Sequence, residues 1–167
     1  IEDIRWNTTE FIGAILPPTE AWMTLQYLET LSMRMEKHSA NTMIVAQYLK
    51  KHPKVDHVNY SGLADHPQHG LACNQMSGHG GLMSFVVRDG VKGAAFFMNH
   101  LKLIVHAVTF GTSRTICMHP PTITHEHLTR QERIKAGIDD GLIRLSVGLE
   151  NPEDLIADLD QALAKLA

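Results

Sequence analysis

The stretch 141–150 reads GLIRLSVGLE, a mostly apolar run with one positive charge, Arg144, near its centre. A short run of this kind, bounded by glycines, is typical of a buried strand. A guanidinium keeps its proton inside a protein, so a core strand tolerates one only where an anion meets it. Its planar fork suits a carboxylate or a phosphate. The pattern leaves two alternatives open: an edge-strand arginine that leans into solvent, or one paired with an internal Asp or Glu.

A long helical region precedes this strand in the chain. It opens after two prolines with Thr19 as the expected cap, ends at Pro53, and should break near 30–33. Apolar residues recur along it at helical intervals and predict one buried stripe. These residues are Trp22, Leu25, Leu28, Met35, Ala46 and Leu49.

The remaining chain alternates extended and helical patterns around the stretch 141–150. Long helices followed by interleaved strands and helices predict an α/β fold of the layered α+β kind, with one small sheet of about four strands. Strands are expected at 55–60, 81–87 and 103–108, helices at 66–76, 91–101, 128–136 and 152–166, and a loop at 109–127.

Length and composition restrict the class of protein. With 167 residues and a formal net charge of −3, the chain suits one well-buried domain and gives no electrostatic case for nucleic acid or an anionic membrane. No apolar run approaches the roughly 20 residues that cross a bilayer. No signal peptide is evident, and two cysteines without CxxC spacing favour a reducing compartment. We therefore expect a cytoplasmic protein with no nucleic-acid or membrane partner. The chain begins at Ile1 without a methionine, which suggests a fragment or a processed product.

Several local motifs have residue types that occur in metal sites, phosphate loops or nucleophilic sites. The pairs His66-x-x-His69 and His125-x-His127 have short, ligand-like gaps, yet no acidic or cysteine partners recur around them at zinc-site spacing, so no metal site is expected. The glycine-rich segment 78–81 leads into a strand rather than a helix, which indicates a turn and not a phosphate loop. Cys117, in a loop beside a histidine, is interpreted as a structural thiol, with a thiolate nucleophile as the alternative.

Several stretches together resemble a known family. The segment 141–150 followed by 152–163 (PEDLIADLDQAL) resembles the end of the Cys/Met-metabolism enzymes that depend on pyridoxal phosphate (PLP), and further matches follow at 17–36, 53–69, 75–85 and 119–137. The family includes cystathionine γ-synthase, cystathionine lyases, methionine γ-lyase and the O-acylhomoserine sulfhydrylases. The resemblance implies that 17–167 form the C-terminal small domain of a fold-type-I enzyme, including its long connecting helix. Its sheet would be mostly antiparallel and covered by helices. Residues 1–16 would be a lead-in from a large domain.

The resemblance also implies what this chain lacks. In the family the large domain carries the Schiff-base lysine and binds PLP. A lysine motif of the Ser-x-Thr-Lys type does not occur in these 167 residues. We therefore expect no catalytic, cofactor-binding or metal residues here, an inactive fragment when alone, and a homotetrameric parent enzyme.

The family's substrate-binding residues can be matched to this sequence. Arg144 corresponds to the arginine that grips the α-carboxylate of the amino-acid substrate, which orients the Cα–H for proton abstraction. Thr109 corresponds to a Ser or Asn that helps to hold the same carboxylate, and Thr124 to the threonine of a Met-Thr-His-like motif beside the arginine. Thr109 and Phe110 depart from the family's Ser-Leu-Gly-like pattern.

Arg114 bears on the choice of substrate. Cystathionine-handling relatives often carry a glutamate at this position, which can meet a distal ammonium group. A guanidinium would oppose that group and could receive a succinyl carboxylate. The resemblance therefore favours an O-acylhomoserine sulfhydrylase that forms homocysteine. Methionine γ-lyase, cystathionine γ-lyase or γ-synthase, and a non-catalytic interaction or assembly domain remain alternatives.

Overall fold

The computed structural model describes residues 1–13 and 15–166, and the chain divides into two compact units, Ile1–Met33 and Arg34–Ala167. The boundary expected at 16/17 remains a prediction about the parent protein. Among the described residues, no helix combines the length and apolar character needed to cross a membrane.

The first unit is mostly helical, with non-helical residues at 13, 15–17 and 30. The segment expected to be a lead-in forms short helical turns. A proline in the first turn opens α3, where a missing N–H is tolerated. No residue of α3 is buried, and Trp22 and Leu25 are 61% and 62% exposed. The expected apolar stripe is therefore present on α3 but uncovered by the described chain. The elements are α1 (Glu2–Ile4), the π-helical turn η1 (Arg5–Thr9), α2 (Glu10–Ile12) and α3 (Pro18–Glu29).

The long helix α4 (Leu31–Lys51) follows α3 after a break at Thr30, as the sequence predicted near 30–33. The part of α4 in the second unit packs on the core through Val45, Ala46 and Leu49, spaced as one helical face. Buried polar residues on the same face are tied to the chain beyond 146. The His38 Nδ1–H donates to the Val147 carbonyl at 2.7 Å. The amide of Asn41 donates to the carbonyls of residues 148 and 150 at 3.0 and 2.8 Å.

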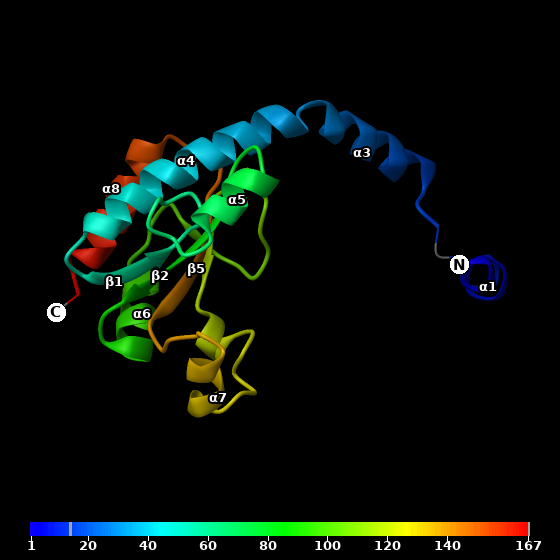
Figure 1. The fold of residues 1–167 in the computed structure, drawn as a ribbon. Coiled ribbons are helices and arrows are strands. Elements are labelled where there is room, and N and C mark those ends of the chain that lie inside the picture. The colour runs from blue at the N-terminus through cyan, green and yellow to red at the C-terminus, as the bar shows by residue number, and fades with distance from the viewer. Residues whose placement is uncertain (14, 167) are drawn as a thin grey trace. The chain divides into compact units, whose positions relative to one another are not determined.

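The second unit contains a five-stranded sheet in the order β1-β2-β5-β4-β3. Figure 1 shows β1, β2 and β5 of this sheet. Three neighbouring pairs are antiparallel and only β3–β4 is parallel. The predicted fold class is confirmed, with one strand more than expected. β4 lies inside the predicted loop 109–127 and is too short to show an alternating pattern. The strands are β1 (Val55–Asn59), β2 (Leu82–Val87), β3 (Val105–His106), β4 (Ile116–Met118) and β5 (Leu142–Ser146).

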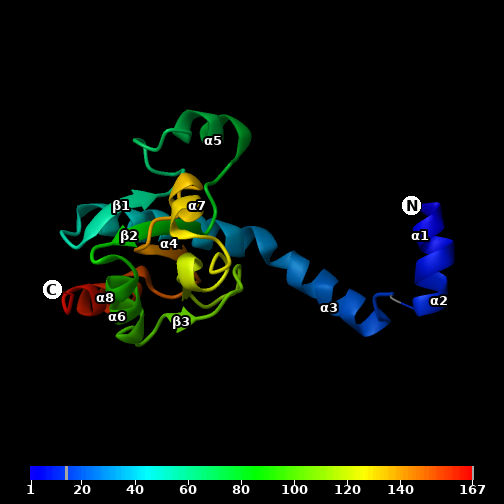
Figure 2. The same cartoon turned by 90° about the horizontal axis from the view of Figure 1, so that it is seen from below.

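Helices cover one face of this sheet and enclose the core (Figures 1 and 2). Phe85, Ile143 and Leu145 are at most 1% exposed and pack with residues of α4, α6 and α8. The helices predicted after 65 are all present, although shorter than expected. They are α5 (His69–Gln75), α6 (Gly90–Asn99), α7 (Arg130–Lys135) and α8 (Pro152–Leu163), with the 3₁₀ turn η2 (Pro120–Thr122).

Asp158 of α8 positions the chain that enters β3. The residue is 5% exposed, and its carboxylate accepts hydrogen bonds from the backbone N–H groups of Lys102, Leu103 and Ile104 at 2.8–2.9 Å. Buried backbone donors need such partners, because an unsatisfied one is costly. This carboxylate thus fixes the start of the segment that leads to the loop beside Arg144.

Candidate carboxylate-binding site

Arg144 lies in the middle of the central strand β5. Its backbone position is paired with Ser84 of β2 on one side and Met118 of β4 on the other. Its neighbours Ile143 and Leu145 are buried in the core, so Arg144 faces the opposite side of the sheet. The edge-strand alternative is therefore excluded.

Backbone carbonyls and an aromatic ring hold the guanidinium of Arg144. Its Nη2 donates to the carbonyl oxygens of Val108 and Thr109 at 2.6 and 2.9 Å. Its Cζ lies 5.7 Å from the centre of the Phe110 ring, within the range of a cation–π contact. These partners orient the group, but none carries a negative charge. The positive charge of Arg144 is therefore not neutralised by them.

One donor of the same guanidinium has no partner. The Nε of Arg144 is buried and has no hydrogen-bond acceptor within the described chain. Nor does any described carboxylate form an ion pair with Arg144. Buried donors in folded proteins are nearly always satisfied, and buried charges are nearly always paired. The arrangement suits an anion brought from outside this chain.

Glu150, the acidic residue at the end of the stretch 141–150, has partners other than Arg144. The carboxylate of Glu150 accepts the N–H of Thr115 at 2.6 Å and its hydroxyl at 2.8 Å. That hydroxyl in turn accepts the N–H of Gly148 at 2.8 Å. Glu150 therefore stabilises the junction between β4 and the end of β5, and the internal acid pairing left open by the sequence is not formed.

A buried serine on the same face of β5 anchors the loop beside Arg144. Ser146 is 2% exposed, and its hydroxyl accepts a hydrogen bond from the N–H of Gly111 at 3.0 Å. Gly111 has a φ of +76°, a conformation that suits glycine. Sequence reasoning missed Ser146, although its spacing of two residues from Arg144 puts both on one face of a strand.

The four predicted substrate-binding residues are not all brought together. Thr109 contacts Arg144 through its carbonyl, while its side chain is exposed. Thr124 is exposed and its hydroxyl lies 2.8 Å from His125 Nδ1. Arg114 is exposed. Within the described residues, neither Thr124 nor Arg114 hydrogen-bonds to Arg144.

His119 holds the segment after β4 in place. Its Nε2 donates to the Asp140 carbonyl at 2.8 Å, and its Nδ1 lies 2.9 Å from the Thr122 hydroxyl. Because a carbonyl only accepts, Nε2 carries the proton and Nδ1 accepts from the hydroxyl. Burial lowers the pKa of His119 below its ordinary value. Hydrogen bonds from Arg130 and then Arg133 hold the pKa of the Asp140 carboxyl below its usual range.

Cys117 and the two histidine pairs singled out in the sequence do not form a site by themselves among the described residues. Cys117 is 1% exposed, and burial raises the pKa of its thiol to about 12, which supports a structural thiol. The ring of His66 hydrogen-bonds to Asn59 through Nε2, and that of His69 to the Ser61 carbonyl through Nδ1. The fold instead brings His69 together with Cys73 and with a histidine of the 77–81 turn. A spacing of four residues on one helix was the missed signal.

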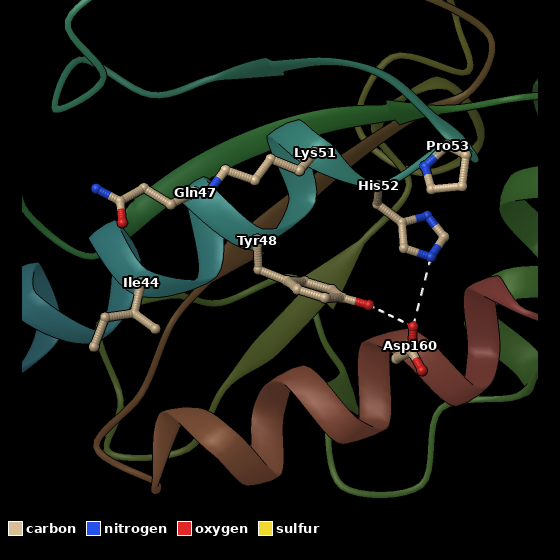
Figure 3. A pocket seen from close by; sticks show the side chains of 7 residues that line it. All are labelled: Ile44, Gln47, Tyr48, Lys51, His52, Pro53 and Asp160. Carbon is tan, nitrogen blue, oxygen red and sulfur yellow. Dashed lines mark hydrogen bonds and ion pairs between the residues drawn. The ribbon is translucent and has the colours of Figure 1, made fainter.

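A separate surface pocket of about 530 Å³ lies between α4 and α8 (Figure 3). The Tyr48 hydroxyl donates to the Asp160 carboxylate at 2.5 Å, and His52 Nε2 lies 3.6 Å from the same oxygen. Burial, and then the bond to Asp160, raise the pKa of Tyr48 above its ordinary value. The tyrosine thus remains a donor that joins two helices. The lining residues are Ile44, Gln47, Tyr48, Lys51, His52, Pro53 and Asp160.

Known proteins resemble this chain in sequence and fold. An L-methionine γ-lyase of Fusobacterium nucleatum subsp. nucleatum is 45% identical over 94% of this chain and 40% of its own length. An O-succinylhomoserine sulfhydrylase of Pseudomonas aeruginosa is 42% identical over 92% of this chain and 38% of its own. A crystal structure described as O-acetylhomoserine (thiol)-lyase from Campylobacter jejuni has a TM-score of 0.90 and 39% identity, and covers 98% of this chain and 39% of that one. The chain thus spans about 40% of the length of these relatives.

The Campylobacter structure contains N'-pyridoxyl-lysine-5'-monophosphate, a lysine joined to the cofactor. The described residues here do not provide such a lysine, because every lysine is exposed or only half-buried. Covalent catalysis by lysine relies on an amine shielded from water. The residues present therefore do not fit the covalent attachment of PLP, whereas Arg144 fits an anionic substrate group.

Sequence and fold agree on the family. The family model described as "Cys/Met metabolism PLP-dependent enzyme" matches residues 2–164, nearly the whole chain. The relatives named above are lyases and sulfhydrylases of sulfur amino-acid metabolism. The chain belongs to the Cys/Met-metabolism family of PLP-dependent enzymes.

Proposed function

We propose that the protein carrying this chain makes or breaks a C–S bond at Cγ of an amino acid, and that Arg144 binds the substrate α-carboxylate. The observation that carries the proposal is the buried, unpartnered Nε of a guanidinium without an acidic partner. An amino-acid carboxylate supplies both the missing acceptor and the missing charge.

The residues around Arg144 have defined roles in this proposal. The carbonyls of Val108 and Thr109 fix the plane of the fork, and the Phe110 ring lies near the guanidinium. A carboxylate held this way loses rotational freedom, which aligns its Cα–H for removal by a base from the rest of the protein. PLP, bound by parts of the protein outside this chain, supplies the electron sink for that chemistry.

An O-acylhomoserine sulfhydrylase that forms homocysteine is the first choice of activity. Arg114 is exposed in the loop that follows Phe110, where its charge can receive the carboxylate of a succinyl group and repels a distal ammonium. Thr124 is a further substrate contact in this proposal, by its match to the family motif. Methionine γ-lyase is the second candidate, because relatives with that name are 44% and 45% identical.

The carboxylate role is tested by Arg144→Ala in the intact protein. Losing a charge-assisted contact of about 3 kcal/mol raises KM by roughly 100-fold. The visible absorbance of bound PLP should stay the same, since Arg144 acts on substrate. Arg144→Lys keeps the positive charge but not the planar fork, so its KM should lie between those of the wild type and Arg144→Ala. Arg88→Ala, which removes an exposed arginine paired with Asp56, is the matched control and should leave KM unaltered. An unchanged KM in Arg144→Ala would remove this residue from the site.

The two candidate activities are separated by their products. A sulfhydrylase converts O-succinyl- or O-acetylhomoserine and sulfide into homocysteine and the free acid. A γ-lyase instead converts methionine and water into methanethiol, 2-oxobutanoate and ammonia. We expect the first reaction to have the higher kcat/KM, and Arg114→Glu to lower it for the succinyl ester more than for the acetyl ester. A higher kcat/KM for methionine would favour the lyase.

A further inference from the structure

A second group of polar side chains lies on α5 and the turn that follows it. Cys73 Sγ is 3.5 Å from His69 Nε2 and 3.9 Å from His79 Nε2. The three atoms all lie within 4.8 Å of one another. We propose that His69, Cys73 and His79 bind a zinc ion.

The two sulfur–nitrogen distances match zinc coordination. Zn–S and Zn–N bonds of about 2.3 and 2.1 Å at tetrahedral angles place sulfur and nitrogen about 3.6 Å apart, and two nitrogens about 3.4 Å apart. The two sulfur–nitrogen distances of 3.5 and 3.9 Å need shifts of only a few tenths of an ångström.

The second nitrogen of each ring faces Ser61, and in His69 this contact frees Nε2 for a metal. His69 Nδ1 lies 2.8 Å from the Ser61 carbonyl, which can only accept, so Nδ1 carries the proton and Nε2 a lone pair. His79 Nδ1 faces the hydroxyl of the same residue, Ser61, at 3.5 Å. Metal-bound histidines characteristically have such outer partners, which set the tautomer and the ring orientation.

The turn that carries His79 is held independently of any ion. The Tyr60 hydroxyl donates to the Gly80 carbonyl at 3.0 Å, and the Gly80 N–H donates to the Ser39 hydroxyl at 3.1 Å. The His79 ring stacks on His69 at 5.5 Å between centroids, with an interplanar angle of 19°. One of the three ligands is therefore preorganised by the fold, which lowers the entropy lost on binding.

By contrast, α5 has little apolar packing of its own. Ala72 is its only buried residue among those described, and Figure 2 shows α5 and its flanking loops projecting from β1 and β2. A bond from His69 and Cys73 to a metal shared with His79 would join this helix to the anchored turn. Metal binding then contributes directly to local stability.

The donor set selects the kind of metal. Two imidazoles and a thiolate suit Zn²⁺, and the absence of a carboxylate from this group of ligands makes it unsuitable for Ca²⁺ or Mg²⁺. Cys73 is exposed, so a fourth ligand, water, can reach the ion from solvent. On binding, the thiol proton leaves to solvent and the Zn–S bond forms, with no change of oxidation state.

The test is a titration of the 167-residue chain, with its thiols kept reduced, using Co²⁺ as a spectroscopic substitute and then Zn²⁺. We expect a thiolate-to-cobalt charge-transfer band that saturates at one equivalent and disappears when Zn²⁺ displaces the cobalt. Cys73→Ser should abolish the band although Cys117 remains. His79→Gln should weaken binding by more than the roughly 10- to 100-fold typical of outer-shell changes. Zn²⁺ should raise Tm in the wild type and not in Cys73→Ser.

His57→Gln, which changes an exposed histidine of β1 outside the group, is the control and should bind as the wild type does. The proposal is overturned if no saturable band forms in the wild type. It is equally overturned if Cys73→Ser and His79→Gln, each shown to be folded by circular dichroism, retain wild-type zinc affinity.

Discussion

At the scale of single residues, the sequence identified Arg144 but not its surroundings. An arginine in an apolar run is visible in one dimension, whereas the carbonyls of Val108 and Thr109 come from a segment more than thirty residues away. Thr124 and Arg114 were named by resemblance alone, and their side chains lie in exposed loops. Loop conformation depends on tertiary contacts that local patterns do not encode.

His119 makes a prediction about pH. Its pKa is lowered in the folded protein, so the unfolded chain takes up a proton near pH 6.5 before the folded one does, and the unfolded state gains stability. The contribution of the neutral ring is therefore complete above pH 6.5 and is lost as pH falls. Urea midpoints measured from neutral pH to about pH 5 should decline, and decline less in His119→Gln. The lowered pKa of Asp140 acts only below its ordinary value of 3.8, outside this window. An equal decline in both proteins would contradict this account.

At the scale of elements, long patterns were predictable and short ones were not. The strands β2 and β5, the break before α4 and the terminal helix follow from periodicity and from glycine and proline positions. The strand β4 has three residues, and β3 has two of the six expected. Such short strands are defined by pairing with β5 and with each other, which a sequence read in one dimension does not contain.

The junction of β4 and β5 depends on one buried hydroxyl. Thr115→Val keeps the shape of the side chain but removes the donor to Glu150 and the acceptor of the Gly148 N–H. Leaving buried groups unsatisfied should lower the free energy of unfolding by about 2 kcal/mol. Thr112→Val is the matched control, because this exposed residue makes one local bond to the Arg114 carbonyl and should change stability by less than about 0.5 kcal/mol. Chemical denaturation measures both, and equal effects would argue against the buried network.

At the scale of the whole molecule, the chain is about 40% of the length of its relatives. Several of its large apolar side chains are exposed to solvent. α3 exposes Trp22, Leu25, Tyr27 and Leu28, each by more than half of its surface. Large exposed apolar groups of this kind mark surfaces that bind other protein. The family, the fold class and the position of Arg144 in a strand could be predicted from sequence, because they depend on motifs within the chain.

The same reasoning predicts how this chain behaves with the cofactor. Because all described lysines are exposed or half-buried, PLP added to the 167-residue chain should form only weak, non-specific adducts. After gel filtration, no stoichiometric visible absorbance should remain, and the chain should have no lyase or sulfhydrylase activity. A stable band from a single lysine would contradict the assignment of the cofactor to the rest of the protein.

The most direct test of the central claim changes both partners of the proposed contact. The intact protein would be titrated with an amino-acid substrate and with its carboxamide, which lacks the negative charge, in the wild type and in Arg144→Ala. We predict that the wild type prefers the carboxylate by roughly 100-fold, and that this preference nearly vanishes in Arg144→Ala. A preference of the same size in both proteins would show that another group binds the carboxylate.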